Sequence, residues 1–209
     1  MSTYNERTAL LVTDVQNDFT DPAGSLAVAG GEAIIPAVNA AVRSALEEGA
    51  LVVATQDWHP ESTPHFAKDG GIWPVHCVAG TWGAELHPSL ELPIDVARVR
   101  KGGNGEDGYS GFTMRDPESG VEHPTELEGL LRERAIERVV VCGLATDYCV
   151  KATALDARRL GLQTHLIEDL TRGVDVPPGA VARAIADMRD AGVHVTRSDE
   201  LLKGTERRR

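Results

Sequence analysis

Residues 9–15 read Ala-Leu-Leu-Val-Thr-Asp-Val (ALLVTDV), a short apolar run without polar alternation. Runs of this kind are typical of strands buried on both faces of a parallel sheet. Apolar residues then recur at helical spacing over residues 34–46, and Gly49 provides a natural helix stop. A second β-rich run, Leu51–Thr55 (LVVAT), follows. The order strand, helix, strand predicts the start of an α/β fold.

The same alternation continues along the chain. Further strands are expected at Ala97–Arg100, Val139–Cys142, Thr164–Ile167 and Val193–Thr196. Helices are expected at Leu127–Ala135, Asp147–Leu160 and Ala180–Ala191. Strands that alternate with helices of this length predict a parallel sheet with right-handed crossovers. We therefore expect one α/β domain over residues 1–209, in which Lys203–Arg209 (KGTERRR) is a disordered basic tail.

Composition and charge exclude several classes of protein. The chain has 209 residues and a formal net charge of −11, which disfavours binding to nucleic acid because phosphate neutralisation needs a basic surface. No apolar run approaches the length of a membrane span, so no membrane partner is expected. The polar start (MSTYNERT) lacks the apolar core of a signal peptide, and three cysteines cannot form a closed disulfide set. These features predict a cytoplasmic protein with reduced thiols.

Polar residues follow four of the expected strands, where ligands collect in α/β sheets. Asp14 ends the first strand, Asp57 follows the second, and Lys101 follows the third. The fourth strand leads into Gly143–Cys149 (GLATDYC), which opens a predicted helix. The long stretch between Gln56 and Leu92 fits neither period and is rich in Pro, Gly, His and Trp, as functional loops often are.

The segment Gln56–His65 (QDWHPESTPH) has the residue types of a metal site. It contains Asp57, His59 and His65, and His76 lies eleven residues further on. Imidazole and carboxylate are the usual ligands of a borderline divalent cation such as Zn²⁺. The alternative is a set of surface histidines in a polar loop. Three histidines and an aspartate within twenty residues favour a metal over that alternative.

Cys149 is the candidate nucleophile, because it lies just inside a predicted helix start. Helix-end amides and the helix dipole favour a thiolate and can hold an oxyanion. On position alone, a buried structural cysteine is an equally good interpretation, and Cys142 and Cys77 are interpreted that way.

Asp14 and Lys101 are the candidate partners of that thiol. A carboxylate in a pocket of low dielectric can accept the thiol proton and later return it to a leaving group. An ammonium beside both would stabilise the charged pair and lower the pKa of the thiol. Taken singly, Asp14 would pass for a turn residue at a strand end and Lys101 for a solvated surface charge.

Four motifs together resemble those of a known family. They are Leu11–Phe19 (LVTDVQNDF), Thr55–His65 (TQDWHPESTPH), Trp73–Pro88 (WPVHCVAGTWGAELHP) with Lys101–Phe112 (KGGNGEDGYSGF), and Gly143–Ala157 (GLATDYCVKATALDA). In this order they resemble the nicotinamidase (pyrazinamidase) family within the isochorismatase-like cysteine hydrolases. The resemblance runs from Ala9 to about Asp169. It implies a three-layer α/β/α fold with a six-stranded parallel sheet.

The resemblance also implies a role for each matching residue. Asp14, Lys101 and Cys149 match the catalytic triad, and the backbone N–H groups of Ala145 and Cys149 match the oxyanion hole. Asp57, His59 and His65 match metal ligands, and His76 matches a fourth ligand found in some members of the family. Phe19, Trp73 and Tyr109 are assigned to the substrate pocket. The Leu144–Ala145 bond falls where the family has a cis peptide bond.

The activity implied by the resemblance is hydrolysis of nicotinamide to nicotinate and ammonia through a cysteine acyl-thioester, in NAD salvage. Pyrazinamide is an expected second substrate. The implied cofactor is one divalent ion per chain, with Zn²⁺ favoured by affinity over Fe²⁺ or Mn²⁺. Relatives are often dimers or larger, so a homo-oligomer is an open expectation.

Three alternatives remain open at this point. The substrate could be another amide, such as an N-carbamoyl compound or a ureido acid. Metal-activated water could attack while Cys149 is incidental. A non-enzymatic metal-binding module is the third, but it leaves Asp14, Lys101 and Cys149 unexplained.

Overall fold

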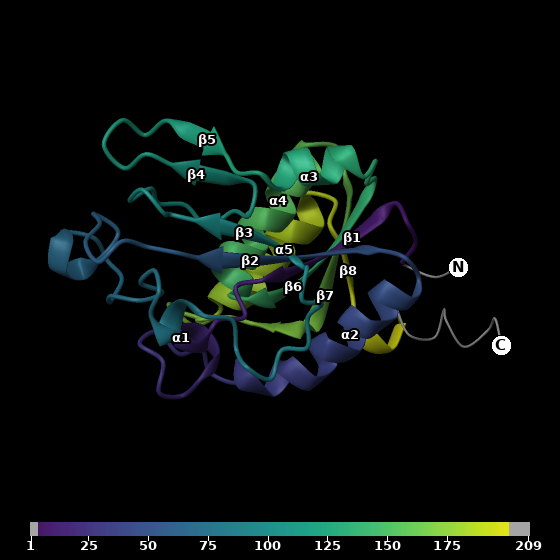
Figure 1. Cartoon of the computed structure of the whole chain (residues 1–209), viewed down its shortest axis with the longest axis horizontal. Coiled ribbons are helices and arrows are strands. Elements are labelled where there is room, and N and C mark those ends of the chain that lie inside the picture. Colours follow the sequence, from purple (N-terminus) through teal and green to yellow (C-terminus); the bar gives the residue numbers. More distant parts are fainter. Residues whose placement is uncertain (1–3, 201–209) are drawn as a thin grey trace.

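A six-stranded parallel sheet forms the centre of the molecule (Figure 1). The computed structural model describes residues 4–200, so the expected tail at Lys203–Arg209 lies outside the described residues. The strand order is β3-β2-β1-β6-β7-β8, and every neighbouring pair is parallel. The strands are β1 Thr8–Thr13, β2 Leu51–Asp57, β3 Ala97–Lys101, β6 Arg138–Leu144, β7 Gln163–Arg172 and β8 His194–Thr196.

Helices cover both faces of this sheet and make the three layers that the resemblance implies. In Figure 1, α2 lies on one side, and α3, α4 and α5 lie on the other. Successive residues of β1 point to opposite faces of the sheet and belong to two separate hydrophobic cores. Leu10 and Val12 pack in the core on the α2 face, and Ala9 and Leu11 pack in the core on the other face. The helices are α2 Ile35–Glu47, α3 Leu127–Glu133, α4 Lys151–Arg159 and α5 Ala180–Asp190. The α/β fold class predicted from the sequence is confirmed.

The structure departs from the expected elements in several places. The helix expected at 147–160 divides into a π-helical turn, Thr146–Val150, and α4. Strand β7 continues five residues beyond its expected end. An antiparallel hairpin, β4 Thr113–Arg115 with β5 Glu122–Pro124, was not expected, because its short exposed strands carry no periodic apolar signal.

Short helical pieces complete the described chain. Helix α1, Asn17–Thr20, follows β1 directly. The 3₁₀ turns are η1 Glu32–Ile34, η2 Ala67–Asp69 and η3 Trp82–Ala84. Apart from η2 and η3, residues 58–96 are irregular, in keeping with a functional loop. Among the helices of residues 4–200, none is long and apolar enough to cross a bilayer.

The sheet register brings together the four strand ends that carry the candidate site residues. Asp57 and Lys101 are the last residues of β2 and β3 and are direct register partners. Thr13, at the end of β1, pairs with Gly143, near the end of β6. The strand order turns in opposite directions on either side of β1 and β6, which is where open α/β sheets bind ligands. All four polar segments therefore lie at the carboxyl-terminal end of the sheet.

Candidate active site

Lys101 is the centre of a buried charged cluster at the strand ends. Its Nζ lies 2.9 Å from Asp14 Oδ2 and 2.8 Å from Asp57 Oδ1, and it donates to the Tyr109 carbonyl at 3.2 Å. The same Nζ lies 3.6 Å from Cys149 Sγ. Lys101 is 1% exposed, Asp14 is fully buried and Cys149 is 6% exposed. Four segments that are far apart in sequence thus converge, as the strand interpretation predicted.

The Asp14 carboxylate is held on both sides. Thr55 Oγ1 donates to Asp14 Oδ1 at 2.5 Å and accepts from the Asp14 N–H at 3.2 Å. Lys101 Nζ donates a hydrogen bond to the other oxygen, Oδ2. Asp14 also has a φ of 48°, which is rare for a residue with a side chain and recurs at functional sites. Thr55, unremarked by sequence reasoning, therefore fixes the orientation of the candidate base.

Burial and charge set the protonation of the cluster. Burial alone would lower the pKa of Lys101, but the carboxylates of Asp14 and Asp57 outweigh it and hold that pKa well above its ordinary value. Burial alone would raise the pKa of Asp57, and the Lys101 ammonium and neighbouring histidines reverse this, so that its pKa lies well below the usual range. Lys101 and Asp57 are therefore both charged at neutral pH.

Asp14 and Cys149 behave differently. Burial raises the pKa of Asp14, and the opposing pull of Lys101 does not cancel this effect. Burial also raises the pKa of the Cys149 thiol well above its ordinary value, although Lys101 acts to lower it. The expected lowering of the thiol pKa by Lys101 is outweighed by burial and the nearby carboxylates. Cys149 is therefore a neutral thiol in the resting protein, and the adjacent Asp14 carboxylate can accept its proton.

Cys149 lies in a tight turn rather than in a regular helix start. Strand β6 ends at Leu144, and the Leu144–Ala145 peptide bond is cis, as the resemblance implies. The N–H groups of Tyr148 and Val150 both donate to the Ala145 carbonyl at 3.1 Å. This π-helical turn places Ala145, Tyr148 and Cys149 on one wall of a cavity.

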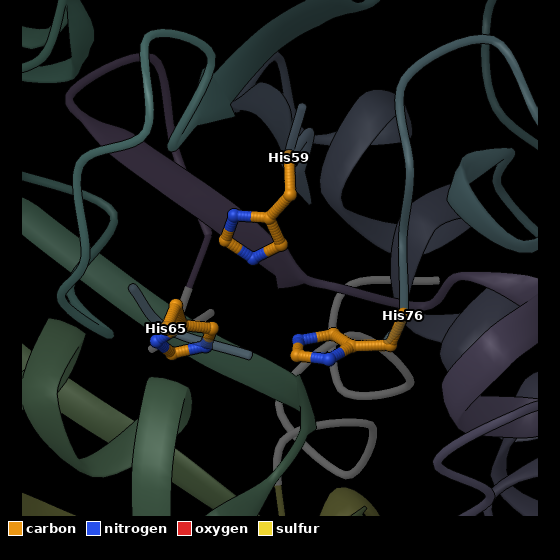
Figure 2. Close-up of side chains that lie close together, drawn as sticks. All are labelled: His59, His65 and His76. Atoms are coloured by element: carbon orange, nitrogen blue, oxygen red, sulfur yellow. The ribbon is translucent and has the colours of Figure 1, made fainter. Parts of the chain in front are cut away.

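The three histidines of the candidate metal site lie together beside this cluster. Figure 2 shows the rings of His59, His65 and His76 brought together from separate parts of the loop. One ring nitrogen of each lies within 4.8 Å of the others. Asp57 Oδ2 lies 3.8 Å from His59 Nε2 and 4.0 Å from His76 Nε2, too far for hydrogen bonds. The Asp57 carboxylate thus faces Lys101 with one oxygen and the histidines with the other.

This donor set fits a divalent cation. Both ring nitrogens of His59 are buried and have no hydrogen-bond partner among the described residues, which is costly for a protein without a ligand there. Burial lowers the pKa of His65 to about 4 and lowers that of His76 as well, so both rings are neutral and able to ligate near neutral pH. Three imidazoles and a carboxylate suit Zn²⁺ and related ions.

Close packing surrounds the His59 ring. A β-carbon at position 102 would lie 2.6 Å from His59 Nδ1, and Gly102 has a φ of 81°, which favours glycine. The turn that follows Lys101 therefore packs directly on the His59 ring, so the end of β3 and the histidine cluster are in contact.

A small cavity opens onto both groups. Its lining includes Asp57, His65, His76 and Cys149, and the rest of the lining is mostly apolar and aromatic. These further lining residues are Phe19, Leu26, Val28, Trp73, Tyr109, Ala145, Tyr148 and Val174. The structure thus places the expected pocket residues Phe19, Trp73 and Tyr109 at the cavity.

Sequence reasoning missed four of these wall residues. Tyr148 precedes Cys149 in the quoted motif, so its place was available from the sequence. Its ring packs edge-on against Trp73 and Tyr109, with centroids 4.9 and 5.2 Å apart. Leu26, Val28 and Val174 lie in loops with no distinguishing pattern, and tertiary structure alone brings them to the cavity.

Other histidines and cysteines lie elsewhere. His87 Nδ1 accepts from the Ser89 N–H and does not join the three-histidine cluster. Cys77 and Cys142 are buried, and all three cysteines, which fall within residues 4–200, are free thiols.

Known proteins resemble the chain over most of its length. The model of the isochorismatase domain matches residues 8–200. The nicotinamidase/pyrazinamidase of Mycobacterium tuberculosis is 42% identical over 90% of this chain and 97% of its own. The pyrazinamidase of Pyrococcus horikoshii, solved in complex with zinc, has a TM-score of 0.82 at 41% identity and covers 91% of this chain and 99% of its own. PnC1 of L. infantum, solved with nicotinate, has a TM-score of 0.83 at 42% identity, covering 94% and 96%.

Proposed function

The chain belongs to the isochorismatase family, and from that premise we propose that it hydrolyses nicotinamide to nicotinate and ammonia. The observation that carries the proposal is one cavity lined by the Cys149 thiol, His65 and His76. The buried Asp14 carboxylate lies next to the thiol, and the buried His59 ring lies next to the other two histidines. Relatives that are 38–42% identical to this chain are nicotinamidases, which disfavours a ureido or N-carbamoyl substrate. Release of nicotinate would place the reaction in NAD salvage.

In the first half-reaction the thiol attacks the amide. Asp14 accepts the Sγ proton of Cys149, and the sulfur forms a bond to the carboxamide carbon. Charge develops on the carboxamide oxygen, for which we propose the N–H groups of Ala145 and Cys149 as donors. Asp14 then gives its proton to the amide nitrogen, and the C–N bond breaks. Ammonia departs, and the acyl group stays bonded to the Cys149 sulfur as a thioester.

The second half-reaction releases the acid. A water molecule gives a proton to Asp14 while its oxygen attacks the thioester carbon. The C–S bond breaks, and Asp14 returns its proton to the sulfur. The acid gives its remaining proton to the solvent, where ammonia takes it up, and nicotinate departs. Lys101 stays protonated throughout and balances the charge on Asp14 and Asp57, as its raised pKa indicates.

We propose Asp57, His59, His65 and His76 as the residues that hold a divalent ion, and Zn²⁺ as that ion. The zinc-bound pyrazinamidase supports this identity, with Fe²⁺ and Mn²⁺ as competitors. When bound, such an ion supplies a Lewis-acidic position for the pyridine nitrogen, an orienting role. The side chains of Phe19, Trp73 and Tyr109 would support the faces of the ring.

Ammonia release from a panel of amides tests the proposal. Nicotinamide and pyrazinamide should be turned over, benzamide should be poor because it has no ring nitrogen, and ureido acids should be inert. Chelation followed by re-addition of Zn²⁺ should abolish and restore the activity. Preferred turnover of a ureido acid would overturn the proposal, and survival of activity after complete thiol alkylation would point to metal-activated water.

A cytoplasmic location and self-association stay predictions. Fractionation of cells that express the chain, and light scattering on the purified protein, would test them.

A further inference from the structure

Asp18 is a buried carboxylate next to the cavity that the reaction above does not use. It lies in α1, beside Phe19, and is 8% exposed. Its Oδ1 accepts from the Ser25 N–H at 3.0 Å, and its Oδ2 accepts from the Cys77 N–H at 2.7 Å. Ser25 lies seven positions from Asp18 in the sequence, and Cys77 lies 59 positions from it.

The two hydrogen bonds lead to two different segments that line the cavity. Ser25 starts the segment that carries Leu26 and Val28, both of which line the apolar side. Backbone bonds continue this link, since the Leu26 N–H donates to the Asp18 carbonyl at 3.1 Å. Cys77 directly follows His76, which lies in the histidine cluster. One carboxylate therefore ties the apolar wall to the segment of a candidate metal ligand.

The backbone at Cys77 needs such a tie. Cys77 has a φ of 47°, which residues with side chains rarely adopt and which persists only where the surroundings enforce it. The His76 ring is fixed further by a 2.8 Å contact between its Nδ1 and the Pro74 carbonyl. The bond from Asp18 to the Cys77 N–H thus acts on the residue whose conformation directs His76.

The space around the carboxylate is closed. A β-carbon at Gly83 would lie 2.1 Å from Asp18 Oδ2, so η3 packs directly on the carboxylate and only glycine fits there. Any side chain at position 83 would therefore displace the Asp18 carboxylate from its two hydrogen bonds.

From this geometry we propose that Asp18 is a positioning residue, which holds the apolar wall and the His76 segment in one fixed arrangement and so stabilises both metal retention and ring placement. The inference rests on the proposed function, since it assigns the histidine cluster to a metal. It predicts that loss of one Asp18 acceptor weakens the hold on the metal without touching a ligand, as residues that orient ligands do.

Asp18→Asn is the informative variant, because asparagine has one acceptor oxygen and would turn an N–H donor toward one of the two amides. Two matched controls are available. Asp21 Oδ1 accepts from the Ala23 N–H in the same loop but reaches no other segment. Asp147 accepts from the N–H groups of Val174 and Asp175 and so holds a cavity wall that carries no histidine.

The experiment follows the release of Zn²⁺ from zinc-loaded protein to a colour-forming chelator, alongside KM and kcat for nicotinamide and the thermal midpoint. Asp18→Asn should release Zn²⁺ roughly ten-fold faster and raise KM. Asp147→Asn should raise KM with Zn²⁺ release unchanged, and Asp21→Asn should change neither. Release from folded Asp18→Asn at the wild-type rate would overturn the inference.

Hydrogen exchange on the wild type keeps the inference testable if the variant does not fold. Chelating the ion should speed amide exchange in residues 24–28, which contain no ligand, as well as in residues 76–78. No change in residues 24–28 would overturn the inference. A wild type that neither binds Zn²⁺ nor hydrolyses nicotinamide would instead overturn the proposed function, together with the inference built on it.

Discussion

The two halves of the candidate site are built in different ways. The thiol half stands on the ends of regular strands, and all three protons of the Lys101 ammonium have acceptors. The histidine half stands on the irregular stretch 58–96, and there both nitrogens of His59 lack partners among the described residues. In the thiol half, the charged Lys101 ammonium finds all of its hydrogen-bond acceptors within the chain. The histidine half has buried ring nitrogens without a hydrogen-bond partner among the described residues, and a bound cation would satisfy them.

This difference teaches how the two halves should respond to perturbation. Groups fixed by a parallel sheet are preorganised, so that changes there remove chemistry but leave the fold. Groups on a loop depend on their ligand for order, so that changes there remove the ligand and the ring placement with it. The predictions below separate these two kinds of failure.

The largest effect is expected from Asp14→Asn. Asparagine cannot accept the thiol proton or return it to ammonia, so kcat should fall roughly 10³-fold or more, while the metal content stays at the wild-type value. Steady-state kinetics and elemental analysis on one sample give both numbers. Because Asp14 and Cys149 are proposed to act in the same step, Asp14→Asn with Cys149→Ala should be little worse than either alone. Multiplied losses in the double variant would contradict the shared step.

Loss of the metal should come next. His59→Ala removes a buried donor, and about one equivalent of metal per chain should be lost with it. Activity on nicotinamide should then fall toward the rate on benzamide, because the ring nitrogen loses its partner. Alkylation of Cys149 should proceed at the wild-type rate, which elemental analysis and thiol titration can check together. Equal turnover of nicotinamide and benzamide by the zinc-loaded wild type would contradict an ion that binds the ring.

Trp73 tests the wall that both halves share. Its indole N–H donates to Tyr109 Oη at 3.1 Å, its ring packs on Tyr148, and it belongs to neither core cluster. Trp73→Ala should raise KM and lower kcat for nicotinamide, with a loss of roughly 0.5–1.5 kcal/mol of ring contact. The thermal midpoint and metal content should barely change. A large drop in thermal midpoint with unchanged kinetics would instead assign Trp73 to the core.

The smallest effect concerns a histidine that lies far from the site. Burial, with help from His194 and Arg138, lowers the pKa of His165 to about 4. Between pH 6.5 and 4 the unfolded chain therefore binds a proton that the folded chain does not, and stability falls as pH falls. Screening of this half-buried ring keeps its contribution below about 1 kcal/mol.

His165→Asn should flatten that part of the pH profile. Urea unfolding of zinc-loaded wild type and variant at pH 7 and 5 measures the difference. A variant with the wild-type pH dependence would show that His165 does not titrate in this window. Activity should be unchanged, in contrast to His59→Ala.

The thiol half was largely predictable from the sequence. Apolar runs fixed the strands, and parallel strands must present their carboxyl ends at one edge, so Asp14, Asp57 and Lys101 could be brought together without a structure. The same logic placed Cys149 after β6. The pKa of Cys149 could not be predicted, because it depends on how completely the folded chain excludes water from the thiol.

The histidine half was predictable in composition but not in shape. Ligand types and spacing indicated a metal, yet no local pattern fixes the path of an irregular loop of this length. Asp18, Asp147 and Val174 act through contacts that span tens of residues. The hairpin of β4 and β5 was missed because its short, mostly exposed strands lack the apolar runs that marked the strands of the central sheet.

The central claim is that Cys149 forms a covalent intermediate with the amide substrate. The most direct test is kcat for ammonia release from nicotinamide by zinc-loaded Cys149→Ala, measured beside wild type with matched metal content and circular dichroism. The account predicts a fall of several orders of magnitude, because no other group can form the thioester. Retention of more than about a tenth of the wild-type kcat, a difference under ~1.4 kcal/mol, would contradict it.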